Sequence, residues 1–252
     1  MATTLNNLNK VLRGLRQFGL LVEAGTEVIT DDYLLMILQF LNEAKEEIEE
    51  GGWPWEALRQ TVTVTLSSGT VQYDIESAGQ ADVDTNDRSR LLYENVNVAG
   101  ANEGFYTTSS SRPQIFDVTD AGEYRLKELT QEKMERFHFT DNDETGDPQY
   151  FSIWSDSDSL KMKVWPTPDS TRTLKLRMYI PQAELADTTI TTDTIKIPNR
   201  PVWTRALFKA NQERGEELGK EGSALHIAML DAHGAAVANE QTAADQTVHL
   251  ER

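Results

Sequence analysis

The residues of this sequence that could carry chemistry are its four histidines and its short acidic clusters. His226 and His233 lie seven residues apart on one expected helix face, which separates them by about 10 Å along the axis. Because this separation is too long for both to bind one metal ion, we interpret them as packing or surface residues. Glu135 and His138 match the Glu-x-x-His element of di-iron bundles, but that chemistry needs a second copy, which the sequence lacks.

Two short stretches resemble ligand-binding loops and depart from them at decisive positions. Gly215–Lys220 resembles a phosphate loop, but its glycines are one residue too close together, and Glu221 replaces the hydroxyl that would hold magnesium. Asp141–Asp147 begins like a calcium loop, but its twelfth position is Ser152 instead of a bidentate glutamate. We therefore predict no cofactor and no bound metal, with adventitious calcium in the acidic loop as the alternative.

Acidic residues concentrate between residues 139 and 160, which hold six acids and no lysine or arginine. Such a density raises carboxylate pKa values and favours a cation or a basic partner, whereas a solvated loop is the alternative interpretation. The six acids are Asp141, Asp143, Glu144, Asp147, Asp156 and Asp158.

The motifs of common enzymes are missing from the sequence. We find neither the Gly-x-Ser-x-Gly of hydrolases nor a dinucleotide-binding glycine pattern, and there is no cysteine. The 41 acids form so many pairs that no carboxylate pair can be singled out for glycoside hydrolysis. We therefore predict that the protein is not an enzyme, and a hydrolase with a carboxylate pair stays as a third alternative.

The net charge of −17 argues against conventional DNA binding, because that affinity comes mainly from lysine and arginine on phosphates. An acidic surface can instead keep DNA from adhering to a wall that it must pass, although the same charge also serves solubility. No apolar run reaches the roughly 18 residues of a membrane-spanning helix. We expect neither membrane association nor a secretory signal.

Hydrophobic spacing predicts four helices, two near each end of the chain. The clearest spans residues 30–50, with a wide apolar face, Thr30 as its cap and Gly51–Gly52 at its end. A helix within residues 3–19 carries Lys10, Arg13 and Arg16 and no acid. Helical spacing returns in 201–215 and, with many alanines, in 222–241.

Strand patterns fill the middle of the chain. Residues 61–66 and 71–75 alternate strictly and flank Ser67–Gly69, which predicts a β-hairpin. We predict a second hairpin in Lys163–Pro181, whose turn lies at Asp169–Ser170. Residues 119–140 fit a short helix or a strand. Further strands are expected at 91–98, 113–118, 149–154, 160–165, 173–180 and 194–197.

These patterns predict an α+β fold in which a helical layer, built from the N- and C-terminal helices, carries an inserted antiparallel β domain of sandwich or barrel type. The helical domain comprises residues 1–52 and 200–242, and the β domain residues 53–199. Residues 243–252 form a C-terminal tail. Within it, a partner-docking segment is predicted that adds a strand to a partner's sheet, and a frayed terminus is the alternative. The segment consists of Thr247, Val248, His249 and Leu250.

The order of these features resembles the head-to-tail adaptor, or connector, proteins of short-tailed bacteriophages. A long amphipathic helix ends in Gly-Trp-Pro-Trp, a β section follows, and a short Ile-Pro segment returns the chain to helix. The resemblance extends over residues 30–235. The residues that match the family's Trp-Pro-x-Pro hairpin, its Tyr-x-x-Pro strand end and its Ile-Pro strand are Trp165, Pro166, Pro168, Tyr179, Pro181, Ile197 and Pro198.

The resemblance implies a structural virion protein at the head–tail junction, made in the host cytoplasm and free of catalysis and cofactor. It implies a ring, usually of twelve copies, that binds the portal protein on one side and the tail nozzle, tail tube and fibre proteins on the other. DNA would pass through the ring without specific binding. The alternative is a carbohydrate- or partner-binding β-sandwich module of a tail, with its tryptophans as stacking surfaces instead of core residues.

Overall fold

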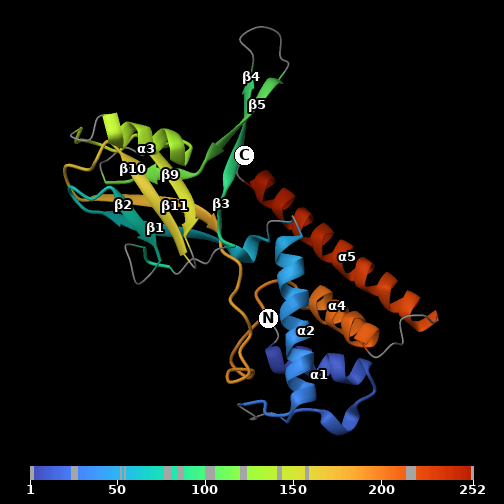
Figure 1. Ribbon diagram of the computed structural model, residues 1–252. Coiled ribbons are helices and arrows are strands. Elements are labelled where there is room, and N and C mark those ends of the chain that lie inside the picture. The colour runs from blue at the N-terminus through green and yellow to red at the C-terminus, as the bar shows by residue number, and fades with distance from the viewer. Residues whose placement is uncertain are drawn as a thin grey trace. The chain divides into compact units, whose positions relative to one another are not determined.

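The computed structural model divides the chain into two compact units, residues 1–58 with 182–252 and residues 59–181 (Figure 1). It describes the whole chain except residues 1–2, 24–27, 52, 54, 77–80, 84–87, 100–105, 120–123, 141–143, 157–158, 214–219 and 251–252. Unit 1 is helical and unit 2 is built mainly of strands, so the predicted α+β fold with an inserted β domain is confirmed. We had placed residues 53–58 and 182–199 in the β domain, whereas the structure places them in the helical unit.

In unit 1, helix α4 packs against each of α1, α2 and α5 and lies between α1 and α5 (Figure 1). Residues such as Val202, Ala206 and Ala210 are buried along it. Helix α1 approaches closely at Gly14, where an added Cβ would lie 2.7 Å from Leu207 Cδ2. The elements are α1 (Thr4–Gly14), a 3₁₀ turn (Phe18–Leu20), α2 (Asp32–Glu50), a second 3₁₀ turn (Glu56–Leu58), α4 (Asn199–Glu213) and α5 (Lys220–Leu250).

Helix α2 confirms the clearest of the predicted helices, with a different cap. Asp31, rather than Thr30, accepts hydrogen bonds from the backbone N–H groups of Tyr33 and Leu34, at 3.0 and 3.1 Å. A carboxylate at this position also suits the positive end of the helix dipole.

An irregular segment, residues 182–198, is fixed to the helices by hydrogen bonds instead of strand pairing. The Asn42 side chain donates to the Leu185 carbonyl at 3.1 Å and accepts from its N–H at 2.8 Å. The predicted strand at 194–197 is therefore wrong, since only an isolated bridge between Thr3 and Thr194 is present there. Its alternating pattern has another cause, which is that Ile195 and Ile197 are buried in unit 1.

Unit 2 places two open sheets around one apolar core. The first sheet runs in the order β1 (Arg59–Leu66), β11 (Arg172–Tyr179), β6 (Ile115–Asp117), β7 (Tyr124–Arg125), with β3 (Arg90–Leu91) also paired to β11. The second runs β2 (Gln72–Ile75), β10 (Ser159–Trp165), β9 (Tyr150–Asp156), β8 (Lys127–Glu128). Strands β4 (Tyr93–Ala99) and β5 (Tyr106–Pro113) form a separate two-stranded ribbon.

Both predicted hairpins are wrong, because each of the two turns carries the chain from one sheet to the other. Strand β1 pairs along its length with β11, and β2 pairs with β10. The two turns lie side by side, since the Gly69 N–H donates to the Pro168 carbonyl at 2.8 Å and Ser68 Oγ donates to the Asp169 carbonyl at 2.9 Å. Gly69 has a φ of +75°, which favours glycine.

The ambiguous region 119–140 contains both kinds of structure. Two-residue strands β7 and β8 precede helix α3 (Gln131–Thr140), which packs on β9 and β10. Met134 of α3 is fully buried. Phe137 stacks on Trp165 with 4.7 Å between ring centroids and lies 6.1 Å from Tyr150.

No helix in the described ranges is both long enough and apolar enough to span a bilayer.

Candidate functional site

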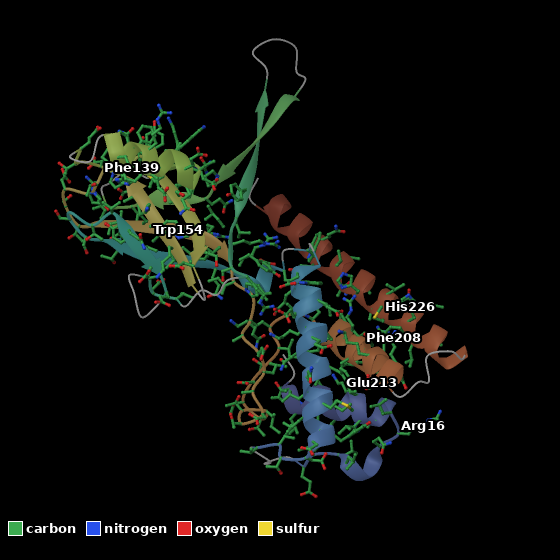
Figure 2. The ribbon with its side chains drawn as sticks, in the orientation of Figure 1. Arg16, Phe139, Trp154, Phe208, Glu213 and His226 are labelled. Carbon is green, nitrogen blue, oxygen red and sulfur yellow. The ribbon has the colours of Figure 1, made fainter. Side chains whose placement is uncertain are left out.

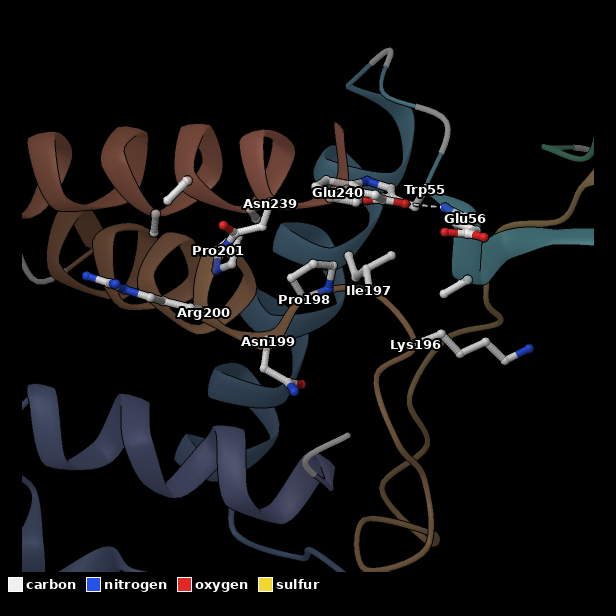
Figure 3. Close-up of a pocket in the computed structure, with 14 residues that line it drawn as sticks. Trp55, Glu56, Lys196, Ile197, Pro198, Asn199, Arg200, Pro201, Asn239 and Glu240 are labelled. Atoms are coloured by element: carbon white, nitrogen blue, oxygen red, sulfur yellow. Dashed lines mark hydrogen bonds between the residues drawn. The ribbon is translucent and has the colours of Figure 1, made fainter. Parts of the chain in front are cut away.

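A groove of about 750 Å³ lies within unit 1, between α5, the start of α4 and the residues that follow α2 (Figure 3). Its hollow shape has a simple cause in the sequence, because α5 presents alanine side chains there instead of bulky ones. Residues 196–201 form the opposite wall. The remaining lining residues are Trp55, Glu56, Ala57, Ala232, Ala235, Ala236, Asn239 and Glu240.

Glu240 ties α5 to the segment that follows α2. Its carboxylate accepts a hydrogen bond from Trp53 Nε1 at 3.2 Å. It accepts another from the backbone N–H of Glu56, a residue labelled with Glu240 in Figure 3. Trp55 is completely buried beside it and donates its indole N–H to the Ile48 carbonyl at 3.1 Å. The groove wall is thus held by hydrogen bonds from both tryptophans.

The groove combines an apolar floor with a polar rim. Lys196 and Arg200 are exposed on one side and Glu56 on the other. Among the described residues, neither basic side chain forms an ion pair. In the part of the chain that the structure describes, no three His, Asp or Glu side chains gather as a metal site would require. An apolar centre with a polar rim is an arrangement that protein–protein interfaces commonly have.

His233 of α5 lies against the edge of Trp55, with 6.0 Å between ring centroids. Burial lowers the pKa of His233, and the positive charge of Arg205 lowers it further. The folded protein thus resists protonation of this imidazole, while the unfolded chain takes up the proton near pH 6.5.

We expect the free energy of unfolding to fall as the pH drops below about 6.5, until the lowered pKa of folded His233 is passed. His233→Gln should remove this component. Urea unfolding between pH 5 and pH 8 would compare it with the wild type and with His226→Gln, an exposed position on the same helix. Equal losses of stability in all three proteins would contradict the assignment.

Helix α1 has one buried and one basic face. Leu8, Val11 and Leu12 are fully buried. Lys10, Arg13 and Arg16 are exposed, and Arg16 follows the helix with a φ of 59° (Figure 2). No acid among the described residues forms an ion pair with these three.

Helix α5 also has two unlike faces. Met229, Ala232 and Ala236 are buried toward the rest of unit 1. His226 reaches Phe208 of α4, with 5.2 Å between ring centroids (Figure 2). On the other side Ile227 and Leu230 are 58% and 55% exposed, so this side of the helix presents apolar surface to solvent.

The sequence also matches the model of a known protein family. The sequence model described as SU10 adaptor protein matches residues 15–249. The chain belongs to the SU10 adaptor protein family. The resemblance to phage head-to-tail adaptors is confirmed, and the match extends beyond the 30–235 on which we had based it. A search of curated proteins gave no match. As a phage adaptor, the protein is a virion component that interacts with other phage structural proteins.

A second, smaller pocket of the adaptor lies in unit 2, between α3 and the second sheet. Its volume is about 390 Å³, and it is lined by Val71, Glu135, His138, Phe139 and Lys163. Glu135 lies 3.7 Å from Lys163, and burial together with the Lys163 charge lowers the pKa of His138. A cation this close to Glu135 and His138 opposes the binding of a metal cation there.

Aromatic residues cover much of the same side of unit 2. Trp165 is stacked beneath α3, whereas Trp154 has the Lys163 ammonium 5.4 Å from its ring. Phe139 is 85% exposed (Figure 2). Packing against α3 explains Trp165. The sequence analysis of the adaptor had missed exposed Phe139, because residues 119–140 fitted either a helix or a strand.

The predicted acidic run is only partly within the described residues, because Asp141, Asp143 and Asp158 lie outside them. Asp147 forms an ion pair with Arg172, which also lies 3.5 Å from Asp117. Ser152, which takes the twelfth position of the calcium-loop pattern, is buried in strand β9 and therefore does not lie in a loop.

The phosphate-loop candidate, Gly215–Lys220, lies almost entirely outside the described residues. The predicted docking residues are found at the end of α5, which extends to Leu250. They are helical in this structure, so docking by strand addition would first require unwinding of the last turns. The docking role itself stays a prediction. These residues are Thr247, Val248, His249 and Leu250.

Proposed function

We propose that this adaptor assembles into a ring, of twelve copies, between the portal and the tail, and that the ring continues the DNA channel. The observation that carries the proposal is the free side of α5, in a chain that belongs to an adaptor family. Ile227 and Leu230 are more than half exposed there. Exposed apolar surface on a helix favours association with another protein surface. A second copy of the same chain can provide that surface.

The charge of the chain supports passage of DNA without specific binding. With a net charge of −17, most of the surface repels phosphate. A DNA-binding protein would instead need a row of lysine and arginine residues on phosphates. The described basic residues of the strand unit are largely engaged by acids or aromatic rings, as Arg172, Lys161 and Arg125 illustrate.

The remaining surfaces suit contacts with other virion proteins. The unit 1 groove and exposed Phe139 of unit 2 each offer an apolar anchor with polar surroundings. We assign these contacts to the portal on one side and to the tail nozzle, tail tube and fibre proteins on the other. In this proposal the protein performs no catalysis and needs no cofactor.

Negative-stain imaging and native mass spectrometry of the protein, alone and mixed with purified portal rings, test the proposal. We expect closed rings on the portal and a mass increase of twelve chains. Single copies scattered over the particle would contradict the ring. They would favour a tail-associated binding module, whose carbohydrate ligands a glycan array would then reveal.

A further inference from the structure

The basic face of α1 stands out in an acidic chain. Residues 3–22 hold three basic residues and no acid, although the chain as a whole has 41 acids and 24 lysines and arginines. We call Lys10, Arg13 and Arg16 the α1 basic face. All three are exposed.

Two basic residues of α4 in the same helical unit are neutralised within the chain, whereas exposed Lys196 and Arg200 form no ion pair among the described residues. Arg205 lies 2.8 Å from Glu47, and Lys209 lies 2.8 Å from Glu43. Glu43 and Glu47 are thus engaged by α4, whereas the three exposed charges of α1 create a local positive potential. A surface of this kind fits an acidic partner.

The outer face of α5 has the complementary properties. We call Ile227, Leu230, Asp231 and Gly234 the α5 outer face, because all four are exposed and recur at helical spacing. Space is open at Gly234, where an added Cβ would meet nothing within 4 Å. Asp231 gives this otherwise apolar face a negative charge beside Ile227 and Leu230.

The position of α4 keeps these two faces apart. Helix α4 packs on both α1 and α5 and lies between them (Figure 1). When one copy uses its α1 face against the α5 face of the next, the first copy keeps a free α5 face and the second keeps a free α1 face. Such a heterologous contact repeats from copy to copy and closes into a ring when the rotation allows it.

We propose that the α1 basic face of one copy binds the α5 outer face of the next copy. This inference rests on the proposed ring and names its subunit contact. The aliphatic stems of Lys10 and Arg13 cover Ile227 and Leu230, as long basic side chains commonly cover apolar surface. Their charged ends then reach Asp231, which is exposed on the same face.

The main test reverses the charge of the α1 basic face with Lys10→Glu, Arg13→Glu and Arg16→Glu in one chain. A matched control, Lys133→Glu with Lys175→Glu and Arg177→Glu, makes the same change in net charge at exposed positions of unit 2. Native mass spectrometry and sedimentation velocity on portal rings would measure assembly. We expect the α1 variant to associate at least about tenfold more weakly than wild type, and the control to form rings.

Two further variants keep the test decisive. Leu230→Asp alters the opposite side of the contact and should also prevent ring closure, while circular dichroism confirms that each variant is folded. Adding Asp231→Arg to the α1 variant should restore part of the lost association, since the charges at this contact are then exchanged.

Distinct outcomes separate the possible failures. Rings that form normally with both the α1 variant and Leu230→Asp would overturn the contact and leave the ring intact. If the α1 variant forms normal rings but loses retention of a short DNA duplex in a gel-shift assay, the basic face binds DNA and the contact is wrong. A wild-type protein that attaches to the portal only as single copies would overturn the ring and this contact with it.

Discussion

Replacement of Trp55 by alanine is expected to lower the free energy of unfolding of unit 1 by about 3–5 kcal/mol, among the largest effects of a single change in this protein. The indole is fully buried, and its removal leaves a cavity beside the groove while the Ile48 carbonyl loses its donor. The contact with His233 is lost as well.

Trp55→Phe helps to separate the two contributions, because it keeps an aromatic ring in the site while it removes the N–H donor. The hydrogen-bond component should cost about 1 kcal/mol, with a further loss for the smaller ring. Urea unfolding followed by far-ultraviolet circular dichroism, which reports the helices, measures both variants. If Trp55→Ala unfolds at the wild-type urea concentration, this tryptophan does not hold the groove wall.

A second large effect is expected at Lys45, which is buried in the helical unit together with Glu49. Its Nζ lies 3.9 Å from the Glu49 carboxylate and donates to the carbonyls of Gln182 and Ala183 at 2.7 and 2.8 Å. Lys45→Met removes the neighbouring positive charge from buried Glu49 and should cost about 3–5 kcal/mol.

The double variant Lys45→Met with Glu49→Leu tests the cause of this loss. It removes both charges but also leaves the Gln182 backbone without its contacts to these side chains, so we expect partial recovery of stability. Lys196→Met, at an exposed position, serves as the control and should change the stability by less than about 0.5 kcal/mol. Limited proteolysis should show faster cleavage within residues 182–198 of Lys45→Met. Unchanged stability and cleavage would mean that this pair does not fix the segment.

Helices were predictable here because their signals are local. The apolar face and acidic start of α2 were enough to place it within two residues at its beginning. Alternation in residues 61–66 likewise identified Val62, Val64 and Leu66 as core residues, and all three are fully buried.

Strand pairing was not predictable, because alternation shows which side of a strand is buried and not which strand lies next to it. Tyr73 and Ile75 face the same core as Val62 and Val64 from the other sheet, a pattern that a hairpin would share. Short turns at Ser67–Gly69 and Asp169–Ser170 fit either arrangement. Neither the groove nor the exposed α5 face could be found without the structure, since both depend on how α4 and α5 pack.

The division of the chain also sets the order in which the protein can form. Unit 2 is one continuous stretch, whose first and last strands pair from Arg59 with Tyr179, so it can fold as soon as it leaves the ribosome. Helices α1 and α2 emerge first but lack α4 until residues 199–213 have been made. At typical synthesis rates their apolar faces wait roughly 10–30 s for that partner. The helical unit is therefore completed last, and a chain whose synthesis stops before residue 199 lacks the helix that covers the apolar faces of α1 and α2.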